Sequence, residues 1–142
     1  MNREVSAGTV LANGCFDIIH AGHVRYLGMA KGLGDVLVVG MNSDRSVRAL
    51  KGSGRPLNNE RDRAEVLAGL GAVDYVTIFA DRTPERLIKL LKPDVLVKGA
   101  DWKVKDIAGA DFVKASGGRV ARVPFVKGCS TTSLINKMRV GS

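Results

Sequence analysis

His20 and His23 are the only histidines of the 142-residue chain, and they lie three positions apart. Both belong to the segment 13–23, N-G-C-F-D-I-I-H-A-G-H, which follows a short apolar run and opens a helical pattern. At this spacing the two imidazoles can share one face of a helix start, where free N–H groups and the helix dipole attract anions. Gly22 between them leaves space for a phosphate to approach the backbone. The segment therefore predicts a phosphate site with two imidazole donors.

Two alternatives remain open for this segment. One is an ordinary loop carrying two surface histidines. The other is a zinc site, which two histidines without a plausible third ligand do not favour, and no metal ligand is assigned. The residues of this segment that we expect to contact a nucleotide are Asn13, Gly14, Cys15, Phe16, Asp17 and Gly22.

A second group of candidates follows the next apolar run. Lys51 and Arg55 lie in a glycine-containing stretch, from which their cationic side chains could reach a phosphate. A solvated charged loop is the alternative, and we favour it for Arg45 and Arg48. The further candidates of this region are Asn42, Asp44 and Arg63, the last of which could reach the same ligand from the following helix.

Two later segments complete the set of candidates. The first, V-K-G-A-D-W, supplies Lys98, Gly99, Asp101 and Trp102. Trp102 is the only tryptophan, and its place at a strand end is as consistent with a ligand wall as with packing. The second, before the last helical pattern, offers hydroxyls and backbone N–H groups as a second anion site. A simple helix cap is its alternative interpretation. Its candidates are Gly128, Ser130, Thr131 and Thr132.

Hydrophobic periodicity predicts the elements that position these residues. We expect strands at 9–12, 35–41, 73–79, 94–98 and 120–124. We expect helices at 22–33, 60–70, 83–91, 107–115 and 132–138, with 43–59 mainly a loop. This alternation predicts an α/β fold in one domain, residues 1–142, with a doubly wound, Rossmann-like parallel sheet of five strands. Ligands bind such sheets beyond the carboxyl ends of the strands, where the candidates stand.

Composition limits the class of protein further. The net charge is +8, and residues 98–142 hold 9 of the 22 basic but only 3 of the 14 acidic side chains. A basic surface attracts polyanions or phosphorylated ligands, and an aromatic content of 5% offers few stacking platforms for single-stranded nucleic acid.

Cys15 and Cys129 follow no metal spacing and are expected to be free thiols. No apolar run approaches the about 18 residues of a membrane span, and no secretory leader is evident, so a cytoplasmic protein is expected.

The segment 13–23 resembles the H-x-G-H signature of the cytidylyltransferase-like nucleotidyltransferase superfamily, and Gly128–Thr132 resembles its G-x-S-T-T signature. Over residues 8–138 the chain is similar to the ADP-heptose synthases, the D-glycero-β-D-manno-heptose 1-phosphate adenylyltransferases. The strings N-S-D-R-S-V-R-A-L-K-G, V-D-Y-V, P-D-V-L-V-K-G-A-D and I-A-G-A-D carry this similarity. Many members fuse this domain behind a sugar kinase, whereas this chain resembles a stand-alone form.

Three positions depart from related patterns. Residues 125–127, F-V-K, stand where glycerol-3-phosphate cytidylyltransferases carry R-T-E, which disfavours transfer of CMP. Residues 80–82, A-D-R, replace an acidic pair, and residues 99–102, G-A-D-W, replace G-G-D-Y. The last two changes bear on which sugar is used rather than on the chemistry.

The resemblance implies transfer of AMP from ATP to a heptose 1-phosphate, with release of pyrophosphate, in a route to lipopolysaccharide or another surface glycan. It implies that His20 and His23 contact the phosphates and stabilise the transition state; we also expect a catalytic role for Lys51, with Mg²⁺ carried on the triphosphate and Asp17 as an indirect partner. It further implies a homodimer or larger homo-oligomer, without a nucleic-acid or membrane partner. The alternatives are cytidylyl transfer to glycerol 3-phosphate or a related polyol phosphate, and a non-catalytic nucleic-acid-binding or regulatory protein of the same fold.

Overall fold

The computed structural model of the protein describes residues 8–124. The strands in this range are β1 (Thr9–Gly14), β2 (Val36–Asn42), β3 (Tyr75–Phe79), β4 (Val95–Gly99) and β5 (Arg119–Val123). The helices are α1 (Ala21–Lys31), α2 (Asp44–Lys51), α3 (Glu60–Ala68), α4 (Glu85–Leu91) and α5 (Ala110–Ala115), with a short 3-10 helix, η2 (Val104–Asp106), before α5.

The strands form one parallel sheet in the order β3-β2-β1-β4-β5, which confirms the predicted α/β class. Leu11 in the central strand β1 pairs with Val38 of β2 on one side and with Leu96 of β4 on the other. The chain runs outward from β1 to β3, then crosses back to β4. The topological switch point therefore lies between β1 and β4, where such sheets bind ligands.

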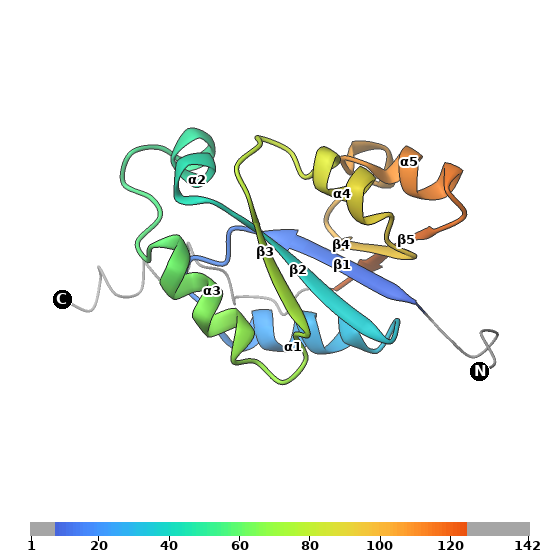
Figure 1. Ribbon diagram of the computed structural model, residues 1–142, viewed down its shortest axis with the longest axis horizontal. Helices are drawn as coiled ribbons and strands as arrows, with labels where there is room; N and C mark the ends of the chain where they lie inside the picture. Colours follow the sequence, from blue (N-terminus) through green and yellow to red (C-terminus); the bar gives the residue numbers. More distant parts are fainter. Residues whose placement is uncertain (1–7, 125–142) are drawn as a thin grey trace.

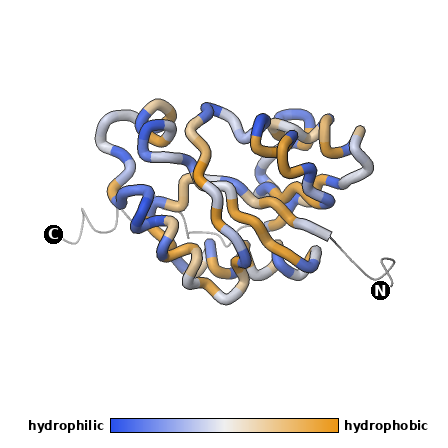
Figure 2. Tube along the Cα trace, in the orientation of Figure 1, coloured by the Kyte–Doolittle hydropathy of each residue, from blue (hydrophilic) through white to orange (hydrophobic). Residues whose placement is uncertain are grey.

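Helices cover both faces of the sheet: α1 and α3 lie on one, α4 and α5 on the other (Figure 1). Tyr26, Leu27 and Leu67 are buried in the first of the two cores. Ile88 and Val113 are buried in the second. The central strands are hydrophobic along most of their length (Figure 2), as parallel strands buried on both faces must be. Between residues 8 and 124, no helix is long and apolar enough to cross a bilayer.

Residues 43–59, predicted to be mainly a loop, contain the helix α2. The Oγ of Ser43 caps it by accepting a hydrogen bond from the Ser46 N–H at 3.1 Å, a contact that favours a helix start. Val47 is fully buried and anchors α2 to the rest of the protein. The glycines that suggested a loop come later, and Gly52 is the C-cap of α2.

The other differences concern element boundaries. The helix predicted at 107–115 begins at Ala110, because η2 precedes it and Gly109 adopts a left-handed φ of 83°. The strand predicted at 73–79 begins at Tyr75. The helix predicted at 132–138 lies outside the described residues.

Candidate active site

A cleft of about 160 Å³ opens at the carboxyl end of the sheet, at the switch point between β1 and β4. Segments from four parts of the chain contribute to it: the loop after β1, the first turns of α1, the end of α2 and the loop after β4. Its lining residues are Asn13, Gly14, Cys15, Phe16, Asp17, His23, Tyr26, Lys51, Lys98, Gly99 and Trp102. All of these except Tyr26 are candidates from the sequence.

The two histidines cap the helix that they introduce. His20 is the N-cap of α1, and its Nδ1 accepts a hydrogen bond from the Gly22 N–H at 3.1 Å. The Nδ1 of His23 accepts in turn from the His20 N–H at 3.2 Å. This reciprocal pair is a capping box, which Ser or Thr and Glu or Gln ordinarily make. Here the two imidazoles accept from two backbone N–H groups at the helix start, those of His20 and Gly22.

These hydrogen bonds determine which imidazole nitrogens carry protons. A nitrogen that accepts a hydrogen bond bears no proton, so each neutral ring must carry its proton on Nε2. The ring centroids of His20 and His23 are 3.9 Å apart, which brings the two rings together. In the described part of the chain, His20 Nε2 is buried without a hydrogen-bond partner. A buried donor without a partner is costly, and an anion between the helix start and the cleft would satisfy it.

Burial keeps the histidines neutral. It lowers the pKa of His20. It also lowers the pKa of His23, and together with electrostatic interactions with His20 and Lys51 brings that pKa to about 4. At neutral pH both rings are therefore uncharged donors with a fixed tautomer.

Two lysines supply positive charge to the cleft. Lys51 ends α2 and acts electrostatically on His23. Lys98 donates from Nζ to Asn13 Oδ1 at 3.0 Å and lies 4.9 Å from the centroid of the Trp102 ring. Burial lowers the pKa of Lys98, while Cys15 and Asp101 oppose that shift. Trp102 is 42% exposed and forms part of the cleft wall, so it is not a core residue.

Asp17 holds the segment that follows α2. Its carboxylate accepts hydrogen bonds from Arg55 Nε at 3.0 Å and from the backbone N–H groups of Leu57 and Asn58 at 2.8 and 2.9 Å. Burial acts to raise the pKa of Asp17, but these donors outweigh it and lower the pKa. Arg55 Nη2 is buried, and the described residues give it no partner, so Arg55 retains a donor that could meet an anion.

The guanidinium of Arg63 forms hydrogen bonds within the protein. Arg63 is 1% exposed and donates to the carbonyls of Cys15, Asn42 and Asn58 and to the Asp44 carboxylate. The candidates Arg63, Asn42 and Asp44 thus form a framework behind the cleft. A direct contact of these three with a nucleotide stays a prediction.

The described residues do not fit a magnesium ion held by the protein. Within residues 8–124, no group of three or more metal-ligating side chains comes together. Asp17, the nearest acidic candidate, has both carboxylate oxygens occupied by protein donors. A magnesium ion would have to arrive on its nucleotide.

The remaining candidates have different positions. Gly22 is buried in the first turn of α1. Asp101 is exposed. Burial raises the pKa of the Tyr26 phenol, and the charge of Asp101 raises it further. Sequence reasoning missed Tyr26, although it follows His23 by three residues and so lies on the same helix face. The candidates Gly128, Ser130, Thr131 and Thr132 lie outside the described residues.

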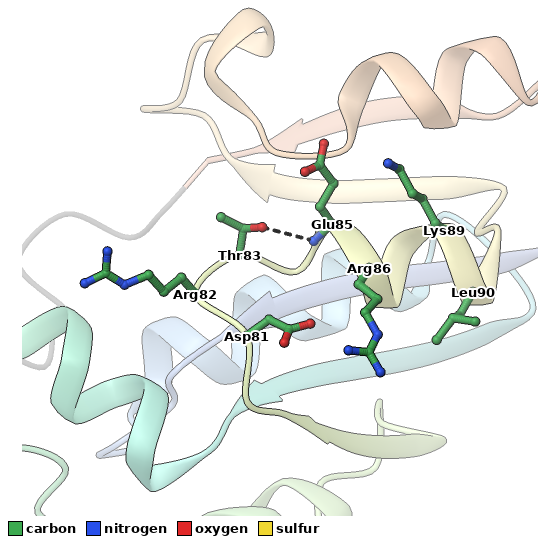
Figure 3. Close-up of a pocket in the computed structure, with 7 residues that line it drawn as sticks. All are labelled: Asp81, Arg82, Thr83, Glu85, Arg86, Lys89 and Leu90. Atoms are coloured by element: carbon green, nitrogen blue, oxygen red, sulfur yellow. Dashed lines mark hydrogen bonds between the residues drawn. The ribbon is translucent and has the colours of Figure 1, made fainter.

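A larger hollow, of about 510 Å³, lies away from these candidates, beside α4. Its walls are Asp81, Arg82, Thr83, Glu85, Arg86, Lys89 and Leu90 (Figure 3). None of these is a candidate from the sequence. The hollow has no histidine in its wall, whereas His23, Lys51 and Lys98 line the smaller cleft, which is therefore the better candidate for chemistry.

Comparison with known proteins shows the family of the chain. The Cytidylyltransferase-like family profile matches residues 11–136. The chain is 58% identical over 130 residues to the bifunctional protein HldE of Campylobacter concisus (strain 13826), covering 92% of this chain and 27% of that protein. The HldE of Aeromonas salmonicida (strain A449) gives the same identity and coverage. The chain thus spans about a quarter of the length of these curated relatives.

Solved structures support the same assignment. The lipopolysaccharide core biosynthesis protein from Thermoplasma volcanium GSS1 matches with a TM-score of 0.68 and 31% identity, over 84% of this chain and 96% of that one. A pantothenate synthetase from Thermus thermophilus, at 19% identity and a TM-score of 0.56 over 89% of this chain and 60% of that one, shares the fold alone. By its match over most of its length, the chain belongs to the cytidylyltransferase-like family of nucleotidyltransferases.

Proposed function

We propose that this protein transfers AMP from ATP to a heptose 1-phosphate, giving an ADP-heptose and pyrophosphate. The observation that carries the proposal is the pair of adjacent imidazoles at the start of α1, with ring centroids 3.9 Å apart and Nε2–H as the only donor of each ring. The similarity to HldE proteins and to a lipopolysaccharide core biosynthesis protein supports a sugar phosphate as acceptor.

In this reaction an oxygen of the sugar phosphate attacks the α-phosphorus of ATP in line with the leaving group. A bond forms between that oxygen and the α-phosphorus, and the bond to the bridging oxygen breaks, releasing pyrophosphate. The attacking phosphate is already anionic, so no proton has to be removed. Catalysis then depends on positioning and on stabilising the negative charge that develops at the α-phosphate and the leaving group.

The site offers donors of two kinds for that charge. His20 and His23 donate from fixed Nε2–H groups, and their neutrality keeps them from binding the ground-state triphosphate as strongly as cations would. Lys51 and Lys98 both line the cleft and supply ammonium groups. We assign the imidazoles to the α-phosphate, and Lys51 and Arg55 to the sugar phosphate or the leaving pyrophosphate.

The direct test is pyrophosphate release in the presence of Mg²⁺. ATP and CTP would each be offered with both anomers of heptose 1-phosphate and with glycerol 3-phosphate. Turnover with ATP and one heptose anomer is expected. Turnover only with CTP and glycerol 3-phosphate would replace the proposal by cytidylyl transfer, and no turnover with any pair would overturn it.

The chain allows variants that separate chemistry from helix capping. His20→Asn retains an N-cap that can accept from the helix N–H groups, and His23→Gln retains the partner residue of a capping box. Each loses one preorganised donor, which costs about 10²–10³ in turnover. Arg25→Gln, on the exposed side of the same helix, is the matched control and should leave turnover unchanged. A His20→Asn or His23→Gln variant with normal turnover would refute the assignment.

A further inference from the structure

Arg63 joins segments that are far apart in the sequence. Its guanidinium donates from Nη1 to the carbonyl oxygens of Cys15 and Asn42, both at 2.8 Å, and from Nε to that of Asn58 at 2.9 Å. Its Nη2 donates to Asp44 Oδ1 at 2.7 Å. Four of the five N–H donors of an arginine are thus used by four protein oxygens. One side chain ties the loop after β1 to the end of β2 and to the segment before α3.

The hydrogen bond from Arg63 to the Cys15 carbonyl lies next to a residue with a strained backbone, Phe16. The Cys15 carbonyl belongs to the peptide unit that precedes Phe16, and Phe16 adopts a φ of 50°. A side chain other than glycine pays about 1–2 kcal/mol for this left-handed conformation, so the loop needs a restraint to keep it. The Arg63 bond fixes the orientation of that peptide unit and supplies such a restraint.

Phe16 transmits the restraint to the histidines. Its ring centroid is 5.5 Å from that of His23, and the rings of His23 and His20 are themselves in contact. Asp17, the next residue, is pinned by the backbone of Leu57 and Asn58. Arg63 also donates to the Asn58 carbonyl. The loop after β1 is therefore held at Cys15 by Arg63 itself and at Asp17 by a segment that Arg63 also binds.

We propose that Arg63 is a positioning residue that sets the orientation of His20 and His23 through the Cys15–Phe16 peptide. This positioning role rests on the proposed function only in the experiment that measures turnover. Burial and four protein acceptors define this positioning role. A lysine cannot replace it, because an ammonium group donates from one point and cannot reach four oxygens spread over a planar fork.

The imidazole signals test this proposal without reference to any substrate. Because the chain has only two histidines, a long-range ¹H–¹⁵N spectrum of the untagged protein contains two imidazole patterns, which report the tautomer of each ring. Wild-type protein should show the Nε2–H tautomer for both. Arg63→Lys should show mixed tautomers and a pKa of His23 that moves from about 4 towards 6.5.

Turnover provides the second readout, measured below the unfolding temperature of each variant. For Arg63→Lys we expect kcat to fall about 10- to 100-fold, as a small misplacement of reacting groups produces, while KM for ATP changes less than about threefold. Leu67→Ala is the control for lost stability, because Leu67 is fully buried one turn later in α3 and makes none of these bonds. It should lower the unfolding midpoint but leave both imidazole patterns and kcat unchanged.

Three outcomes would decide the matter. Wild-type imidazole patterns in a folded Arg63→Lys variant would overturn the proposal, whatever the turnover. If that variant does not fold, Asp44→Ala, which removes one of the four acceptors, should still shift the patterns in the same direction, and its failure to do so would also overturn it. If wild type turns over none of the offered substrates but Arg63→Lys changes the tautomers, the positioning role stands and only the proposed reaction fails.

Discussion

The imidazole cap should make the stability of this protein depend on pH between the ordinary and the lowered pKa of His23. Burial, followed by the charges of His20 and Lys51, lowers the pKa of His23 to about 4 from an ordinary value of 6.5. Between these values the unfolded chain binds a proton at His23 that the folded chain does not. The stabilisation is therefore complete above pH 6.5 and is lost progressively as the pH falls towards 4.

The linkage relation gives the size of this effect. With pKa values of 6.5 and about 4, lowering the pH from 7.5 to 5.0 reduces the free energy of unfolding by about 2 kcal/mol at most. Partial access of water to the ring reduces this to about 1–2 kcal/mol. His20, whose pKa burial also lowers, acts in the same direction. Since the chain has no third histidine, no other side chain has an ordinary pKa within this range.

Urea unfolding of wild type and His23→Gln at pH 7.5, 6.25 and 5.0 measures the effect. Glutamine can keep the hydrogen bond to the His20 N–H, as it does in ordinary capping boxes, but it does not titrate. We expect wild type to lose about 1–2 kcal/mol more stability than the variant between the two extreme pH values. Equal pH slopes for the two proteins would refute the lowered pKa of His23.

Four further outcomes can be measured. His20→Ala should lose about 1 kcal/mol of stability through the missing cap, whereas His20→Asn should retain it, as thermal unfolding would show. Asp17→Asn should cost at least about 2 kcal/mol in urea unfolding, because three hydrogen bonds to a buried carboxylate are weakened. Lys98→Met keeps an apolar stem but no charge, so calorimetric titration with ATP should show about tenfold weaker binding than to wild type. Gly109→Ala should destabilise by more than Gly117→Ala, because both have positive φ but only at 109 would the new Cβ meet a side chain, at 2.5 Å; equal losses of stability would refute the clash.

The strand pattern and the residues that line the cleft could be predicted from the sequence because both rest on local signals. Apolar runs identify strands that are buried on both faces, and the ends of parallel strands meet at one edge of the sheet. That topology brings Asn13, Lys98 and Trp102 together, although β1 and β4 are separated by most of the chain. The order of the strands could not be predicted in this way, because doubly wound sheets with different strand orders share the same alternation of strands and helices.

The roles of individual polar residues could not be predicted in this way. Arg55 and Arg63 look alike in the sequence, but one retains a buried donor without a partner in the described residues and the other uses its donors on the backbone of three segments. Asp17 has the appearance of a metal partner, and its carboxylate is instead occupied by Arg55 and by backbone N–H groups. Such differences depend on which carbonyl or carboxylate lies opposite a side chain in space, and spacing along the chain does not contain that information.

The central place of β1 has a consequence for how the protein is made. Of the five described strands β1 emerges from the ribosome before the others, yet one of its two edges stays open until β4 arrives, and Asn13 and Lys98 are 85 residues apart. At about 5–20 residues per second, translation of that interval takes about 4–17 s. For that time a nascent chain exposes the unpaired edge of an apolar strand, which invites pairing with other chains. The cleft, too, can form only after the fourth strand has left the exit tunnel.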